Sequence, residues 1–273
     1  MKSSAIQNLP RIALLMFEGH GLGRIMLNEF KNAGIVPVLI VEESSKLAKK
    51  RATFYEVQHA VSCPGLVTVP EYLKQAKADG ANVTHVTVAN INDDEVVAAL
   101  KKASVDLIVL GGARIVKDHI LECAPHGGIN THPAILPWVQ GSLPVCQSIY
   151  LGFPIATSCH RVSPVLDKGA LCSIEFLDRS NCSKRHEDLI YLTNRQSAHQ
   201  VIKVIEHLAT KGSIPTCEKL SNIEGECHNW EDDIEEKARA VLADPNYVAP
   251  EWETWSVGPM HAQLEKEDAL KTK

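Results

Sequence analysis

Apolar runs of strand length alternate with helical segments from residue 11 onward, and this alternation limits the folds that the chain can adopt. The first run, Ile12–Phe17, is continuous, as expected for a strand buried on both faces. A helical pattern over residues 22–33 follows and ends at Gly34. Strands joined by helices pair in parallel through right-handed crossovers, so we expect an α/β fold with a mostly parallel sheet flanked by helices. Further strands are expected over residues 35–41, 83–88, 106–110, 156–162 and 170–176, and further helices over 47–58, 92–103, 116–123 and 184–211.

The composition is that of an ordinary globular protein, and it argues against several classes of partner. The 273 residues are 45% hydrophobic and 22% charged, which allows a full core. A formal net charge of -5 predicts no basic face, so nucleic acid is not expected as a partner. No apolar stretch has the length of a signal-peptide core or a membrane span, so we expect a cytoplasmic protein that does not associate with membranes. The eight scattered cysteines are then expected as reduced thiols.

The chain changes in character near residues 212–215. We expect a catalytic domain over residues 1–215 and a short C-terminal appendage over residues 216–273. The appendage has 14 acidic against 6 basic residues and is small for an independent domain. It is expected to contain a helix over 229–242 and to pack on the core through its tryptophans. These tryptophans could form a homodimer contact or one wall of a binding pocket, and they are Trp230, Trp252 and Trp255.

Three polar residues suggest a reaction centre. Asn130 and His132 are two apart, so on a strand they point to the same side, and Pro133 ends that strand. Ligands of parallel sheets bind beyond the carboxyl ends of the strands, where this pair is expected. Asp167 lies on a later turn that contains glycine. An amide, an imidazole and a carboxylate together suit the addition of a nucleophile to a carbonyl group. Taken singly, each of these residues could equally belong to a turn or to a satisfied polar pair.

The segment around these residues resembles the catalytic segment of the folate-dependent formyltransferase family. That family includes glycinamide ribonucleotide, methionyl-tRNA and sugar N-formyltransferases. Residues 106–116 are similar to the strand and loop where the family holds the pterin end of the folate, and the resemblance extends over residues 11–210. The matching positions are Asn130, His132, Pro133, Leu136, Pro137, Gly141, Gly152, Thr157, His160, Asp167 and Gly169.

The resemblance implies a Rossmann-like fold and 10-formyltetrahydrofolate as co-substrate. It also implies that Asn130 and His132 stabilise the oxyanion formed when an amine attacks the formyl group. Asp167 would handle protons and, by its proximity, keep His132 cationic. No covalent enzyme intermediate and no metal are expected. The expected cofactor contacts are Arg114, Ile115, Val116 and Leu166. His160 is expected as a structural or supporting residue.

Other motifs are less specific. Gly19, Gly21 and Gly23 follow the first strand, but they do not match the dinucleotide-binding pattern and no acid is placed for a ribose. In purine-pathway relatives a loop in this place holds the acceptor's phosphate, and we expect these glycines as substrate contacts, although a tight turn would also explain them. Zinc is not expected, because neither motif has the usual paired ligand spacing; the motifs are Cys123 with His126, and Cys217 with Cys227 and His228.

The sequence departs from the family mainly where the acceptor would bind. Trp138-Val139-Gln140 stands where many relatives carry basic residues, and Lys168 replaces a small residue after Asp167. We expect transfer of the formyl group to a small primary amine, such as an amino sugar on a nucleotide. Initiator tRNA is less expected, because the relatives that use it carry a basic C-terminal domain where this chain has an acidic tail. Purine synthesis is possible, but residues 138–140 and the tail fit it poorly. Two alternatives remain open. One is hydrolysis of 10-formyltetrahydrofolate by the same residues, and the other is a non-catalytic folate-binding protein.

Overall fold

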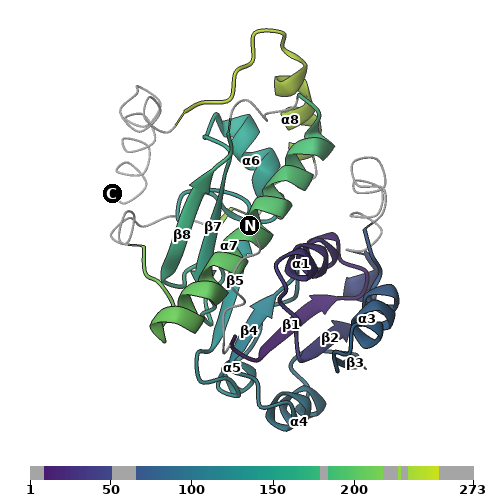
Figure 1. The fold of residues 1–273 in the computed structure, drawn as a ribbon. Helices are drawn as coiled ribbons and strands as arrows, with labels where there is room; N and C mark the ends of the chain where they lie inside the picture. The colour runs from purple at the N-terminus through teal and green to yellow at the C-terminus, as the bar shows by residue number, and fades with distance from the viewer. Residues whose placement is uncertain (1–8, 51–65, 179–183, 218–226, 229–232, 252–273) are drawn as a thin grey trace, which may run out of the picture.

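A computed structural model describes residues 9–50, 66–178, 184–217, 227–228 and 233–251 (Figure 1). Its main sheet has seven strands in the order β3-β2-β1-β4-β5-β7-β8. The first five strands of that order are parallel, whereas β7 and β8 run antiparallel to their neighbours. The expected mostly parallel α/β sheet is therefore confirmed. The strands are β1 Ile12–Phe17, β2 Leu39–Glu43, β3 Thr84–Val88, β4 Leu107–Leu110, β5 Gly128–His132, β7 Ala156–Arg161 and β8 Leu171–Phe176.

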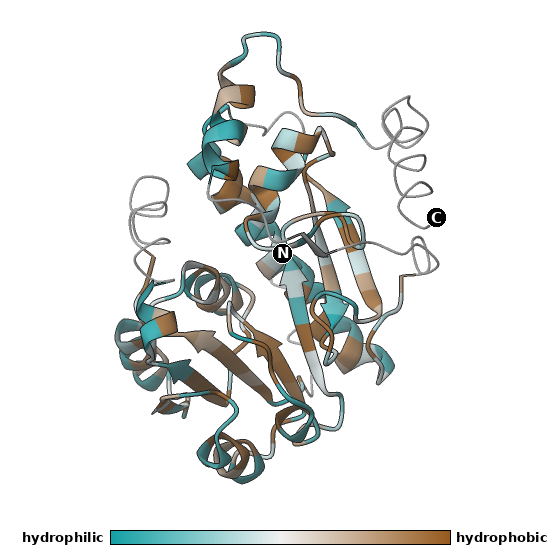
Figure 2. Ribbon diagram, turned by 180° about the vertical axis from the view of Figure 1, so that it is seen from behind, coloured by the Kyte–Doolittle hydropathy of each residue, from teal (hydrophilic) through white to brown (hydrophobic). Residues whose placement is uncertain are grey.

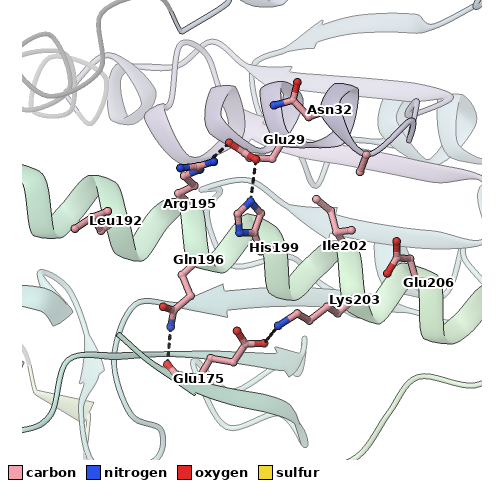
Figure 3. Close-up of a pocket in the computed structure, with 11 residues that line it drawn as sticks. Glu29, Asn32, Glu175, Leu192, Arg195, Gln196, His199, Ile202, Lys203 and Glu206 are labelled. Atoms are coloured by element: carbon pink, nitrogen blue, oxygen red, sulfur yellow. Dashed lines mark hydrogen bonds and ion pairs between the residues drawn. The ribbon is translucent and has the colours of Figure 1, made fainter. Parts of the chain in front are cut away.

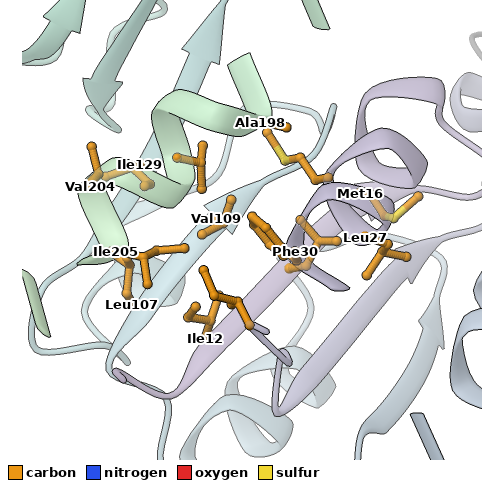
Figure 4. Packing of buried hydrophobic residues seen from close by; sticks show 14 of the residues in the cluster. Ile12, Met16, Leu27, Phe30, Leu107, Val109, Ile129, Ala198, Val204 and Ile205 are labelled. Carbon is orange, nitrogen blue, oxygen red and sulfur yellow. The ribbon is translucent and has the colours of Figure 1, made fainter. Parts of the chain in front are cut away.

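Helices cover both faces of this sheet. On one face, α1 and the long helix α7 pack on the alternate residues Ile12, Leu14 and Met16 of β1 (Figure 4). On the other face, the intervening residues Ala13 and Leu15 pack with α4 and α5. Figure 2 shows β1 and the neighbouring β4 as largely hydrophobic, as burial on both faces requires. The helices are α1 Gly21–Asn32, α3 Val69–Ala78, α4 Asp94–Lys102, α5 Asp118–Leu121, α6 Pro144–Leu151, α7 His186–Lys211 and α8 Ile234–Ala243.

Several elements differ from the expectation. The second strand begins at Leu39 rather than at residue 35, and Pro37, which has no N–H for a ladder, precedes it. Helix α3 was not predicted, although the sequence contains its start signal. Thr68 and Glu71 form a reciprocal capping box there. Of the helix expected over 47–58, residues 46–50 are helical and residues 51–58 lie outside the described residues.

The described part of the appendage packs on the end of the sheet near α6. Ile234, Ala238 and Leu242 of α8 are buried against Val145 and Ile149 of α6. A small parallel pair joins β9, Cys227–His228, to β6, Gln140–Gly141. The helix predicted over 229–242 begins at Ile234, and the three appendage tryptophans lie outside the described residues. Within the described ranges, no helix is both long and apolar enough to cross a membrane.

Candidate functional site

Strand β5 places Asn130 and His132 on the same face of the sheet. Ile129, between Gly128 and Asn130, is buried in the apolar cluster under α7, so its neighbours point to the opposite side. Antiparallel pairing with β7 sets Asn130 opposite His160 and His132 opposite Ser158. The side chains of these four residues therefore lie on one face of the sheet, at the carboxyl end of the last parallel strand.

Asp167 reaches this ladder from the connection between β7 and β8. Its backbone is left-handed, with φ of 54°, and its side chain is buried. The close approach of the connection to β7 requires Gly169, because a Cβ there would lie 1.6 Å from the carbonyl oxygen of Arg161. Gly141 N donates to Asp167 Oδ2 at 3.1 Å and fixes the carboxylate from a second side.

The structure brings the three predicted catalytic residues together. His132 Nδ1 lies 3.6 Å from Asp167 Oδ2, and His160 Nε2 lies 3.8 Å from Asp167 Oδ1. Asn130 Nδ2 lies 3.3 Å from His160 Nε2. The carboxylate is thus shared between two buried imidazoles, and the second imidazole contacts the amide.

The hydrogen bonds of His132 define its tautomer. Its Nε2 lies 2.8 Å from the carbonyl oxygen of Val139, which can only accept, so Nε2 carries the hydrogen. Nδ1 then faces Asp167 and is the position that gains or loses a proton. Burial lowers the pKa of His132 by more than Asp167 and Val139 raise it. Asp167 thus favours the charged form of His132, as expected, but loss of hydration outweighs the nearby charge, and the net direction of the pKa favours the neutral ring.

The supporting role expected for His160 fits its contacts. Its Nδ1 lies 2.9 Å from the carbonyl oxygen of Arg161 and donates to it. In the neutral ring Nε2 is then an acceptor, and Asn130 Nδ2 donates to it. Burial lowers the pKa of His160, with an opposing effect from Asp167, so the ring favours this neutral form.

A small pocket of about 60 Å³ adjoins Asn130, His160 and Asp167. This volume holds no more than a few water molecules. The four predicted cofactor contacts all line it, and they are Arg114, Ile115, Val116 and Leu166. At its rim, the apolar side chains of Ile115, Val165 and Leu166 are 56%, 57% and 43% exposed. Exposed apolar groups gathered around a polar floor are typical of a ligand site.

The guanidinium of Arg114 is paired with a carboxylate of the protein, so it is not expected to bind a ligand. Its Nε donates to Oε2 of Glu43 at 2.6 Å, and its Nη2 contacts Oε1 of the same carboxylate. Glu43 is fully buried at the end of β2 and also accepts from Ile91 N and Ser45 Oγ. Arg114 can therefore contribute to the pocket through its backbone and aliphatic stem, while its charge is paired with Glu43.

The predicted glycine contacts lie at the turn from β1 into α1. Gly19 has φ of 72°, and its N–H lies 3.4 Å from the buried carboxylate of Glu42. Gly21 and Gly23 are buried in the first turn of α1, where a Cβ on Gly23 would lie 3.0 Å from Gly111 O. Close packing against Gly111 explains why position 23 is a glycine. The Glu42 carboxylate beside Gly19 would repel a phosphate group. Their role in acceptor binding stays a prediction.

A larger cavity, of about 610 Å³, lies on the opposite face of the sheet between α1 and α7 (Figure 3). Glu29 of α1 is paired there with Arg195 at 3.0 Å and with His199 at 2.8 Å. None of the predicted site residues lines this cavity. Over the described part of the chain, no three His, Cys, Asp or Glu side chains are placed to hold a metal ion, and the side chains of Cys227 and His228 lie outside it.

Two functional groups had no signal in the sequence, because they belong to the backbone. The Val139 carbonyl fixes the tautomer of His132, and the Gly141 N–H fixes Asp167. Any residue type at position 139 could provide that carbonyl. Only the fold of the segment after Pro137 reveals these contacts.

Comparisons with known proteins identify related sequences. The sequence profile described as formyl transferase matches residues 11–178. A methionyl-tRNA formyltransferase of Thermus thermophilus is 24% identical over 188 residues, which are 65% of this chain and 58% of the relative. One from Rhodopirellula baltica is 35% identical over 85 residues, which are 30% of this chain and 25% of the relative. The matches thus span between a quarter and just over half of these relatives.

Solved structures show the same fold. Glycinamide ribonucleotide transformylase 1 from Symbiobacterium toebii has a TM-score of 0.55 at 17% identity, covering 74% of this chain and 89% of that one. A 4-N formyltransferase from Francisella tularensis has a TM-score of 0.53 at 14% identity, covering 88% and 90%. The sheet matches that of the solved structures and the profile matches more than half of the chain, so the chain belongs to the formyl transferase family.

Proposed function

We propose that this protein transfers a formyl group from 10-formyltetrahydrofolate to a primary amine of a small molecule, with a nucleotide-linked amino sugar as the first candidate. The observation that carries the proposal is the convergence of Asn130, His132 and Asp167 beside a pocket with an apolar rim. An amide donor, an imidazole and a carboxylate at one point provide what an acyl transfer to an amine requires.

The residues divide the chemistry between oxyanion and proton. Asn130 Nδ2 has a second hydrogen besides the one directed at His160, and this hydrogen is available to the formyl oxygen as it gains negative charge. The attacking amine must lose a proton. Asp167 and the Nδ1 of His132, 3.6 Å apart, provide a pair of adjacent acceptors for it. With a proton on Nδ1, His132 becomes a cation beside the reacting group and adds electrostatic stabilisation.

The pocket wall over residues 113–116 suits the pterin end of the folate. Its apolar rim provides a surface for a flat ring and for the aromatic group attached to it. Among the described residues, the N–H and C=O of Val116 have no hydrogen-bond partner, so they are available to the polar edge of a heterocycle. The present volume of about 60 Å³ is too small for that ring, so binding requires the segment with Val165 and Leu166 to move outward.

The acceptor is proposed to lie on the side of Asp167 that faces Gly141 and the segment after Pro137. Position 139 there contributes its carbonyl to His132, and Gln140 donates to the carbonyl of Pro137 at 2.7 Å. A small uncharged segment of this kind does not provide the cationic surface that a large polyanion such as tRNA binds.

The test is release of tetrahydrofolate from 10-formyltetrahydrofolate, with a panel of amines that includes amino sugars on nucleotides, glycinamide ribonucleotide and methionyl-tRNA. Release that depends on one amine, and that is lost in His132→Ala, supports the transferase. Release without any amine identifies a hydrolase instead. Release that depends only on methionyl-tRNA overturns the small-molecule acceptor. Failure to bind the folate at all overturns the proposal.

A further inference from the structure

Asn92 contacts the pocket wall from behind. It lies between β3 and α4, and its Nδ2 donates to the carbonyl oxygen of Ile115 at 3.0 Å. Lys117 N donates to Asn92 Oδ1 at 2.8 Å. The two bonded groups flank Val116 in the chain. One side-chain amide therefore holds the backbone on both sides of this residue.

The amide of Asn92 is itself held in a fixed orientation. Its own N–H and Nδ2 lie 3.0 and 3.3 Å from Oδ1 of Asn90. His119 Nε2 lies 2.9 Å from the carbonyl oxygen of Asn92. A helix was expected to begin at residue 92, but α4 begins at Asp94 and Asp93 occupies its N-cap. The Asn92 side chain is thus not needed to cap this helix.

The wall is anchored at two points. Glu43 holds the guanidinium of Arg114, and Asn92 holds the backbone at Ile115 and Lys117. Between these anchors stands Val116, whose side chain is buried in the core and whose N–H and C=O are not bonded to any described residue. Val116 lines the pocket, whereas Asn92 does not. Asn92 can therefore affect a ligand only through the wall that it holds.

We propose that Asn92 is a positioning residue for the folate. It fixes the backbone at Val116, so that the N–H and C=O of Val116 meet the pterin without prior ordering of residues 113–116. This inference rests on the proposed function. A preorganised wall spares the ligand the entropy of ordering the segment, so the effect falls on binding of the folate. The chemical step depends on Asn130, His132 and Asp167, none of which Asn92 contacts.

The experiment compares Asn92→Ala and Asn92→Asp with the wild-type chain. Asn92→Ala removes both bonds to the wall, whereas Asn92→Asp keeps an acceptor for Lys117 N–H and loses the donor to Ile115. The control is Asn32→Ala, an exposed residue at the end of α1. Titration calorimetry with 5-formyltetrahydrofolate, a stable folate, measures Kd, and initial rates with 10-formyltetrahydrofolate give KM and kcat. Thermal unfolding of each variant is recorded in parallel.

We expect Kd and KM to rise about tenfold in Asn92→Ala, since two hydrogen bonds that hold the wall are lost, with kcat at saturating folate within about twofold of wild type. Asn92→Asp should also bind more weakly, and Asn32→Ala should match wild type. An unchanged Kd in the folded Asn92 variants, or a fall in kcat without a change in KM, would overturn the inference alone. Absence of folate binding by the wild-type chain would overturn the proposed function and this inference with it.

Discussion

Asn130 and His160 face each other across β5 and β7, and the Nδ2 of Asn130 lies 3.3 Å from the Nε2 of His160. Because His160 Nδ1 donates to the carbonyl of its neighbour Arg161, its Nε2 must accept. The amide of Asn130 is thereby oriented with Nδ2 toward the ring, and its second hydrogen is placed by the same contact. A backbone carbonyl on β7 thus sets the direction of a proposed oxyanion donor on β5.

Asn130→Ala should lower kcat about 10²–10³-fold, the usual effect of removing one oxyanion donor. His160→Ala should have a smaller effect, because Asn130 remains but loses its orientation. Steady-state rates with the amine that supports release of tetrahydrofolate in the panel measure both. Equal losses in the two variants would contradict the assignment of the donor to Asn130 and of the support to His160.

Asp167→Asn should abolish most of the turnover and leave the fold intact. The residue has φ of 54°, a left-handed conformation that asparagine adopts readily, and its side chain can still accept from Gly141 N. What it loses is the negative charge that takes the proton of the amine. The measurement is kcat beside the unfolding temperature. A variant with wild-type kcat would exclude Asp167 as the proton acceptor.

Stability should fall when the pH is lowered below about 6.5. Burial lowers the pKa of His132, His160 and His186 from their ordinary value of 6.5, so the folded chain excludes protons that the unfolded chain binds. Their stabilising contribution is full above the unfolded pKa and is lost as the pH falls through the lowered folded values. Urea unfolding at several pH values measures this decline.

A matched variant separates one histidine from the site. His186 is buried at the start of α7 with Cys146 Sγ 2.9 Å from its Nε2, and it does not line the pocket beside Asn130. His186→Gln should flatten part of the acid decline without changing the pH dependence of turnover. A free energy of unfolding that is constant from pH 7.5 to 5 in the wild-type chain would contradict the lowered pKa values of the three buried histidines.

Gly169→Ala should destabilise the chain by roughly 1–3 kcal/mol and also lower activity, because the added methyl meets Arg161 O and the Asp167 turn must shift. Gly212→Ala is the control. Gly212 ends α7 with φ of 72° and open space around it, so the methyl costs only about 1 kcal/mol of backbone strain. Unfolding and kcat are measured on both. Full activity in Gly169→Ala would show that the turn tolerates displacement.

The sequence predicted those elements that follow from the pattern of apolar and polar residues. The continuous apolar run of β1 and the periodic apolar positions of α7 specified their elements to within two residues. The convergence of Asn130, His132 and Asp167 followed from their spacing and from the family resemblance. Helix α3 was missed even though Thr68 and Glu71 form a capping box, because the segment has few buried positions.

What could not be predicted depends on tertiary contacts. The protonation of His132 reflects how completely the ring is buried, and a sequence does not give that burial. The pairing of Arg114 with Glu43 joins residues 71 positions apart, and it removes from the pocket a charge that the sequence offered as a ligand. The Val139 carbonyl and the Gly141 N–H are present in every chain whatever its side chains, so only their placement makes them functional.

Strand β5 is the boundary between the parallel and the antiparallel part of the sheet, and the boundary has a consequence for how this protein can change. The proposed reaction centre comes from residues 130–167, on the antiparallel side, whereas Asn92 and the folate wall come from the parallel side. The two regions share β5, they pack on each other through α1 and α7, and both line the folate pocket. Under the proposed placement of the acceptor, side-chain substitutions at Trp138 and Ser142 would change acceptor preference and leave residues 113–116 of the folate wall as they are, so acceptor choice would be the more evolvable property.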